Sequence, residues 1–325
     1  MSENKYYAPV HSATQQGARP DGRGWVPEEE VRSYYGRPVL KEPVWTWEIP
    51  WYFFFGGLAG ASSVLSLAAR ATGNEVLTRR ALLVALGGAT VSPVLLIMDL
   101  GRPTRFYNML RVVKPTSPMS LGTWVLSAFG TSTGAAVATD LLGVFPRLGR
   151  ALEVASAILG PALSTYTAVL ITDTSVPVWH EARRDLPLVF AASSAASAGA
   201  AAAMLTPATD AAPARRLAVG GALAELGMME LMKRRLGSLL AEPYKREEAG
   251  RFDKLSKACT GVGAATMVLV GRKSRAAAFA SGALMLAGAV FERWSVFRAG
   301  FQSARDPKYS VMPQRERLKT REASA

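Results

Sequence analysis

Long apolar runs constrain the fold of this chain more than any other feature of its sequence. A helix needs roughly 20 apolar residues to cross a hydrocarbon core about 30 Å thick. About eight blocks approach or reach that length, at residues 49–69, 81–99, 119–142, 152–172, 186–206, 216–232, 257–271 and 276–297. The sixth block carries two glutamates and the seventh is short, so seven helices is the alternative count. We predict an all-α polytopic membrane protein with about eight transmembrane helices, arranged as two four-helix bundles.

The basic residues between the blocks predict the orientation in the membrane. With both termini on one side, that side holds 28 of the 38 Lys and Arg residues and the other side holds 10. The positive-inside rule then places both termini in the cytoplasm and the protein in the inner (plasma) membrane. The net charge of +13 is dispersed among loops rather than gathered on one face, which argues against nucleic acid as a partner.

Four segments follow from this pattern. A soluble tail covers residues 1–46, the first bundle 47–180, the second bundle 181–297 and a basic C-terminal tail 298–325. The first segment contains no apolar stretch of the signal-peptide type, so we expect it to be retained. It either lies on a partner or on the membrane surface, or forms a disordered arm.

Cysteine and histidine are too scarce for a resident redox metal. Cys259 is the single cysteine, so the sequence predicts no disulfide and no iron–sulfur cluster in this chain. The two histidines, His11 and His180, lie in the tail and in a loop, so we expect neither haem nor another bound metal. In an electron-transfer complex, the metal centres would belong to another subunit.

The first block begins with an aromatic belt and continues with small residues. Trp45-Thr-Trp-Glu-Ile-Pro-Trp51 suits the headgroup region. Within it, the Glu48 carboxylate either interacts favourably with the positive end of the helix dipole or relays a proton at the mouth of a pocket. The run Gly56-Gly-Leu-Ala-Gly60 predicts close helix packing rather than a nucleotide loop.

The second block ends in the charged turn Met98-Asp-Leu-Gly-Arg-Pro-Thr-Arg-Phe106. A carboxylate at the membrane edge needs a partner, so we predict an ion pair between Asp99 and Arg102 or Arg105. Proton handling, or docking of a partner by the basic loop, is the alternative. The next block opens with Ser117-Pro-Met-Ser120, where either serine can serve as an N-cap.

The later blocks contain a few isolated polar residues. Tyr166 lies in the fourth block and reads, from the residues alone, as an interfacial or hydrogen-bonded core side chain; Asp173 follows at the end of that block. In the sixth block Glu225 is a candidate for a proton path, whereas Glu230 can pair with the basic residues that follow it. Glu292-Arg293 closes the eighth block, where we expect snorkelling or a surface pair.

Several of these motifs, in this order, resemble one known family. Gly56-Gly57, Asp99-Leu-Gly-Arg-Pro103, Ser117-Pro-Met-Ser120 and Gly122-Thr-Trp124 are similar to the NrfD/PsrC family, the quinone-binding membrane subunits of polysulfide-reductase-type complexes. The resemblance is densest over residues 47–180. It implies that Tyr166, in a Tyr-Thr pair, donates a hydrogen bond to a quinone carbonyl. Some members place Asn or His at the start of the first helix as its polar partner, where this chain has Glu48 and Trp51.

The helix ends place these residues on one face of the membrane. The first and third helices begin there and the second and fourth end there, so one pocket can be bordered by Glu48, Asp99, Ser120, Tyr166 and Asp173. A quinone needs an apolar cleft, a donor for its carbonyl and a route for two protons. Glu225, Asp173 and Arg102 are the candidates for that proton path.

We interpret the protein as a quinone-binding membrane anchor of a multisubunit oxidoreductase without a catalytic metal centre of its own. The resemblance implies an iron–sulfur subunit as electron partner, a molybdenum or tungsten catalytic subunit beyond it, and menaquinone or ubiquinone as cofactor, with proton translocation as an extension. Two other classes remain: a transporter or channel, and a structural anchor without a quinone site. A transporter is expected to show midplane charges in several helices or repeats of broken helices.

Overall fold

Helices make up the regular structure of the described residues. The computed structural model describes residues 39–271 and 274–324, so most of the predicted N-terminal tail lies outside it. Eight long helices follow the eight apolar blocks: α1 (Glu48–Ala71), α2 (Glu75–Asp99), α4 (Pro118–Leu142), α5 (Pro146–Thr172), α7 (Leu186–Leu205), α8 (Ala212–Leu240), α9 (Glu247–Leu269) and α10 (Arg275–Arg305). Shorter elements are η2 (Pro103–Arg105), α3 (Tyr107–Arg111), α6 (Pro177–Glu181), η3 (Pro243–Lys245) and the terminal α11 (Lys308–Ser324). The predicted all-α class is confirmed.

Six of the described helices are both long and apolar enough to cross a membrane: α1, α2, α4, α5, α7 and α10. The protein is therefore a multi-pass membrane protein, as predicted. The two long helices outside this set, α8 and α9, correspond to the sixth and seventh blocks. α9 begins at Glu247, ten residues before the predicted block, and its first half is charged.

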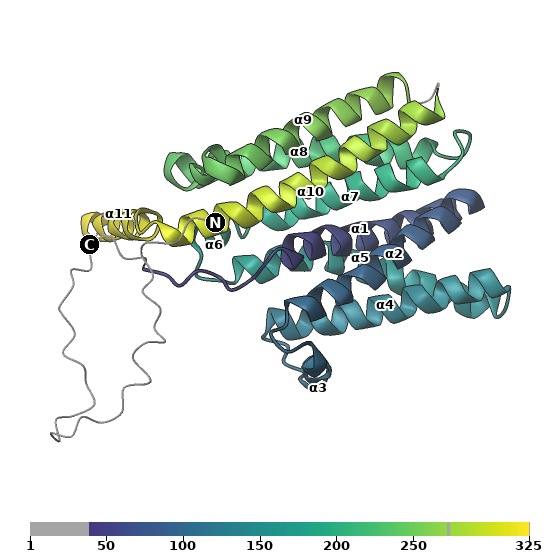
Figure 1. Cartoon of the computed structure of the whole chain (residues 1–325), viewed down its shortest axis with the longest axis horizontal. Helices are drawn as coiled ribbons and strands as arrows, with labels where there is room; N and C mark the ends of the chain where they lie inside the picture. The colour runs from purple at the N-terminus through teal and green to yellow at the C-terminus, as the bar shows by residue number, and fades with distance from the viewer. Residues whose placement is uncertain (1–38, 272–273, 325) are drawn as a thin grey trace.

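The long helices run in alternating directions. α3, α6 and α11 lie at one end of the array, which we call the tail-bearing end; α1, α4, α7 and α9 begin there (Figure 1). The connections 72–74, 143–145 and 206–211 lie at the opposite end, as do the end of α9 and the start of α10. The ends of the described residues meet at the tail-bearing end, where Arg305 pairs with Glu42 at 2.6 Å.

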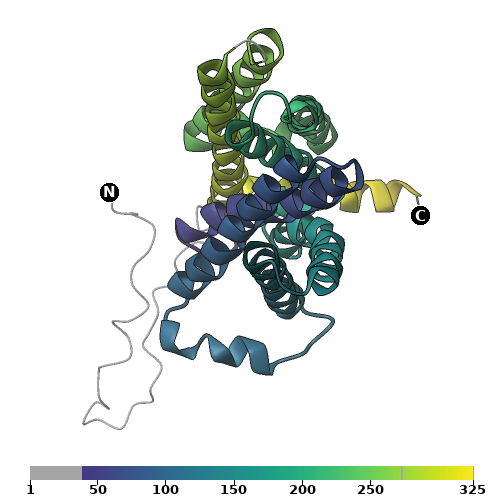
Figure 2. The same cartoon turned by 90° about the vertical axis from the view of Figure 1, so that its right-hand side faces the viewer.

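The helices pack in two groups, which meet where α1 of one group contacts α7 of the other. α1 contacts α2 and α5, α4 packs on α5, and α7 packs on α8 and α10. Viewed along the helices, α8 to α10 lie on one side of α1, and α4 and α5 lie on the other (Figure 2). α1 also contacts α7 and α10, so the two groups pack directly against each other. The division into two domains stays a prediction.

The small residues of α1 allow close helix packing, as the sequence predicted. α1 and α5 cross at Gly60 and Gly160, where a Cβ atom on Gly60 would lie 2.3 Å from the Gly160 carbonyl oxygen. The reverse distance, from a Cβ on Gly160 to the Gly60 carbonyl oxygen, would be 2.4 Å. Any side chain larger than hydrogen would separate these two backbones.

α11 is held at the tail-bearing end by polar contacts outside the membrane-spanning helices. Lys308 pairs with Glu242 at 2.9 Å, and the Tyr309 hydroxyl donates to the same carboxylate at 3.1 Å. The hydrogen bond from Lys308 lowers the pKa of Glu242, and the same bond raises the pKa of Lys308. Further along the helix, Arg317 pairs with Glu181 of α6.

Candidate functional site

The start of α1 and the end of α2 bring two carboxylates together. Glu48 is buried, and the Thr46 hydroxyl bonds to its carboxylate. Both the Thr46 hydroxyl and its backbone N–H lie 3.4 Å from Asp99 Oδ1. Thr46 therefore bridges Glu48 and Asp99, whose charges lie close enough to interact. The two acids therefore lie at the same end of the helix array, as predicted.

The ion pair predicted for Asp99 is not formed among the described residues. Asp99 accepts hydrogen bonds from Thr46 and lies close enough to Glu48 for their charges to interact, while Arg102 and Arg105 are exposed in the turn after α2. The prediction of pairing with either arginine is wrong for this part of the molecule. The physical reason is local: η2 begins at Pro103, and the Arg102 backbone leaves the helical conformation (φ −134°, ψ 87°), which carries both side chains away from α2.

Tyr166 lies against α4 at the glycine of the predicted Gly-Thr-Trp motif. A Cβ atom on Gly122 would fall 1.9 Å from Tyr166 Cζ and 2.1 Å from its hydroxyl oxygen. The phenol therefore occupies the space that the missing side chain leaves. Two motifs separated by more than 40 residues in sequence, at Gly122 and Tyr166, are joined at one point of the structure.

Tyr52 of α1 is the neighbour of Tyr166 that sequence reasoning missed. Its side chain is fully buried, and its hydroxyl faces that of Tyr166 closely enough for the two phenols to interact. The Tyr52 hydroxyl has no hydrogen-bond partner of ordinary geometry among the described residues. The signal that could have found it is spacing: Tyr52 follows Glu48 by four residues, so both share one face of α1.

Trp51 and Ser120 take other positions near this end. Trp51 is half-buried, with its ring centroid 6.1 Å from that of Phe55 in a stacked arrangement. The Ser120 hydroxyl donates to the Val112 carbonyl at 2.9 Å and accepts the Lys114 N–H at 3.0 Å. Ser120 thus fixes the loop before α4 with its donor hydrogen in use. Ser117 is the N-cap residue of α4 by position, without a side-chain capping bond.

The candidates for the proton path are dispersed. Asp173, at the C-terminal cap of α5, and Arg102 are both exposed at the tail-bearing end. Glu225 lies in α8 and is only 2% exposed, so the structure does not group it with the other two. Glu230 is half-exposed and pairs with Arg234 at 3.5 Å and with Lys257 at 3.6 Å. Pairing of Glu230 with the basic residues at the end of this helix was predicted and is confirmed.

The expectation for Glu292 and Arg293 is wrong. They are 1% and 2% exposed, and they pair with each other inside the protein rather than at its surface. The reason is that α10 continues to Arg305, thirteen residues beyond Glu292. Arg293 also donates to the Phe190 carbonyl at 3.1 Å and to the Ser194 hydroxyl at 3.3 Å.

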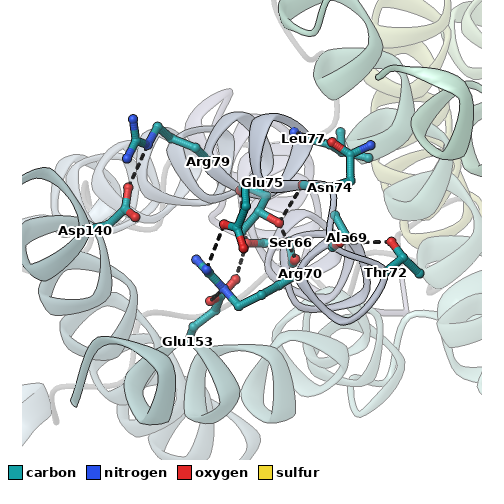
Figure 3. Close-up of polar contacts among 11 residues, drawn as sticks. Ser66, Ala69, Arg70, Thr72, Asn74, Glu75, Leu77, Arg79, Asp140 and Glu153 are labelled. Atoms are coloured by element: carbon teal, nitrogen blue, oxygen red, sulfur yellow. Dashed lines mark hydrogen bonds and ion pairs between the residues drawn. The ribbon is translucent and has the colours of Figure 1, made fainter. Parts of the chain in front are cut away.

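A cavity of about 170 Å³ lies at the end opposite the tail-bearing end, between α1, α2, α4 and α5. Arg70 and Glu153 line it and form an ion pair, and Ser66 donates to Glu153 at 2.5 Å (Figure 3). Arg79 and Asp140 pair nearby at 2.9 Å. The buried Glu153 was missed because it stands second in an apolar block, where a charge reads as interfacial.

The fold and the six apolar helices define a multi-pass, all-helical membrane protein. Within that class the protein belongs to the NrfD family, since the family model "Polysulphide reductase, NrfD" matches residues 38–241. The family predicted from the motifs is confirmed. Glu48, Asp99, Tyr166 and Glu225 lie inside the matched region, and Glu292 lies beyond it.

The sequence is also similar to a subunit of the polysulfide reductase of Wolinella succinogenes. The two are 29% identical over an alignment of 179 residues, and the match covers 46% of this protein and 54% of that subunit. The matched region therefore spans about half the length of the curated relative.

Proposed function

We propose that this protein is the quinone-binding membrane subunit of a multisubunit oxidoreductase. One observation carries the proposal: the Tyr166 and Tyr52 hydroxyls face each other between α1, α4 and α5, and Tyr52 has no hydrogen-bond partner of ordinary geometry among the described residues. A buried hydroxyl without a partner is costly, and a quinone carbonyl would accept its hydrogen bond. The similarity to a polysulfide reductase subunit supports the same assignment.

The residues present fit the needs of a quinone, which takes up two electrons and two protons on reduction. Tyr166 and Tyr52 would bind and orient its carbonyl oxygen. Glu48 and Asp99, bridged by Thr46, hold carboxylates at the aqueous edge of the same helix ends, where they would exchange protons with water. Trp51 would contribute apolar surface beside them.

The electron partner in this proposal is an iron–sulfur subunit docked on the tail-bearing end, followed by a molybdenum or tungsten catalytic subunit. Most of the basic residues belong to loops and tails on this side, so the surface is suited to an acidic partner. The positive-inside count makes this side cytoplasmic. A reporter fusion to the C-terminus tests the orientation: an active alkaline phosphatase together with a dark fluorescent protein would reverse it.

Substitution of Tyr166 in the intact complex tests the quinone site. Tyr166→Phe removes one hydrogen bond, so quinone binding should weaken by about two- to twelvefold, the equivalent of 0.5–1.5 kcal/mol. Dye-linked activity of the partner subunits should not change. Tyr107→Phe, on the exposed surface of α3, is the matched control. A structural anchor without a quinone site predicts unchanged quinone-coupled turnover in both variants.

Proton translocation through Glu225 extends the proposal. Glu225 is a buried carboxylate in α8, and buried acids of membrane proteins mark proton pathways in many pumps. Glu225→Gln in proteoliposomes should lower the number of protons moved per electron. Unchanged translocation at undiminished turnover would remove Glu225 from any proton path. The transporter alternative would gain support from solute flux that is independent of quinone.

A further inference from the structure

The interface of α7, α8, α9 and α10 contains a buried charged cluster with one acid more than bases. Glu225 of α8 and Glu292 of α10 are each 2% exposed or less, and their charges interact. Arg293 pairs with Glu292 and is the basic side chain that acts on both carboxyl groups. Two carboxylates and one guanidinium would leave a net charge of −1 buried inside the protein, which is costly without a further positive charge.

The hydrogen bonding of the cluster is also incomplete. Glu225 Oε2 and Glu292 Oε1 are buried oxygens without a partner among the described residues. The other carboxylate oxygens are used: Thr260 of α9 donates to Glu225 Oε1 at 3.4 Å, and Arg293 bonds to Glu292 Oε2. The Ser193 hydroxyl of α7 lies near both carboxyl groups and is itself without a hydrogen-bond partner of ordinary geometry among the described residues, but its single proton can serve only one of the two open oxygens. An added proton on one carboxyl would neutralise the charge and supply the missing hydrogen bond.

A second buried pair in the same protein serves as a reference. Arg70 and Glu153, at the cavity near the opposite end, combine one guanidinium with one buried carboxylate, and Ser66 donates to that carboxylate (Figure 3). Glu75 also pairs with Arg70 but is 68% exposed, so water screens its charge. The positive charge of Arg70 balances the negative charge of the Glu153 carboxylate, so Glu153 needs no added proton.

We propose that Glu225 and Glu292 form a proton-binding site that holds one shared proton beside Arg293. The site goes beyond the quinone proposal, because its occupancy follows from charge and burial alone. Use of this proton by the quinone would rest on the proposed function.

Buried titratable groups link the site to the tail-bearing end. Tyr244 is fully buried, has a hydroxyl without a partner among the described residues, and interacts with both Glu292 and Asp253. Asp253 pairs with the buried Lys233 and, at 3.4 Å, with Lys257, which is 43% exposed. We extend the proposal to an exchange route in the order Glu292, Tyr244, Asp253, Lys257, in which the Tyr244 hydroxyl must turn toward each carboxylate in turn, since it bonds to neither of them.

Infrared spectroscopy of the full-length protein in its complex tests the occupancy, because a protonated carboxyl has a carbonyl band that a carboxylate lacks. Glu225→Gln and Glu292→Gln should each abolish the band of this site completely, since either variant leaves one carboxylate balanced by Arg293. The matched control Glu153→Gln should leave the band unchanged. Arg293→Gln should raise the count from one protonated carboxyl to two.

Deuterium exchange of the same band tests the route. Tyr244→Phe should slow the exchange and leave the band intensity unchanged. If the protonated-carboxyl band survives in both Glu225→Gln and Glu292→Gln, the shared proton is refuted. A band reduced to half in each variant also refutes it, because each carboxyl would then hold a proton of its own. If the protein shows no protonated-carboxyl band and sodium stabilises it, the site binds a metal ion rather than a proton, and the proposal is wrong. Quinone binding is measured separately, so its failure in Tyr166→Phe leaves this result unaffected.

Discussion

Gly122→Ala gives the sharpest test of the geometry around Tyr166. The added Cβ would lie 1.9 Å from Tyr166 Cζ, whereas ordinary contact begins at 3.4 Å, so the phenol must move by about 1.5 Å. The atoms that meet the new methyl group are the far end of a side chain, which can turn aside at small cost to folding. The main consequence is a displaced hydroxyl.

The expected size of the effect follows from that displacement. A hydrogen bond lengthened by more than 1 Å is lost, and a neutral bond is worth about 0.5–1.5 kcal/mol. Quinone binding to Gly122→Ala should therefore weaken by about two- to twelvefold. The loss should not add to that of Tyr166→Phe, because both changes remove the same bond.

The assay is the binding of a quinone analogue to the purified complex in lipid nanodiscs. Gly130→Ala is the control, since it lies on the same helix with no atom within 4 Å of the added Cβ. Equal binding by the two alanine variants would refute the reasoning. Full additivity of Gly122→Ala with Tyr166→Phe would also contradict it, because the effect of the methyl group would then lie elsewhere.

Three further predictions concern stability. Gly60→Ala forces a Cβ to 2.3 Å from a backbone oxygen of α5 and should lower the free energy of unfolding by about 1–3 kcal/mol. In Gly87→Ala the added Cβ meets open space, so the free energy of unfolding should rise by about 0.5–1 kcal/mol. Thermal unfolding that ranks the two variants the other way would contradict the helix crossing. Arg70→Ala strands a buried carboxylate and should cost about 3–5 kcal/mol in the same measurement, so a loss below about 1 kcal/mol would show that the pair is solvated. Because the pKa of Glu242 is lowered in the folded protein, its contact with Lys308 should persist at neutral pH and fail as the pH falls through that lowered value. Hydrogen exchange in α11 should rise over that acid range and lose this pH dependence in Glu242→Gln.

The apolar blocks predicted the eight long helices because length and hydropathy decide what can lie in a bilayer. They located the helix ends less well. α9 begins ten residues early, at Glu247, because Asp253 on its first half is neutralised by Lys233 of α8. A hydropathy average counts these two charges as a barrier to burial, although the fold brings them together. Pairing between helices is not visible in a single window of sequence.

The same limit explains the successes and failures at the candidate sites. Tyr166 and Asp99 stood out because polar residues are rare in their blocks. Glu292 was assigned to the surface, and Glu153 was passed over, because each stands near the edge of an apolar block. α10 continues for thirteen residues after Glu292, about 20 Å of helix, so the edge of the block is not the edge of the fold. Tyr52 was hidden among aromatic neighbours that serve as packing.

α1 places the two proposed sites on either side of a single helical turn. A Cβ on Gly56 would lie 3.7 Å from the Tyr52 ring, whereas a Cβ on Gly57 would lie 3.4 Å from Arg293 Nη2 and 2.3 Å from the Ser194 hydroxyl. The Gly-Gly pair therefore separates the Tyr52 side of α1 from the Arg293 side by the thickness of one backbone. A charge that develops beside Tyr52 would act on Arg293 across a region of low dielectric, where electrostatic interactions are strong. Such coupling needs no continuous series of hydroxyls between the sites, because Arg293 interacts with both carboxyl groups of the proton-binding site.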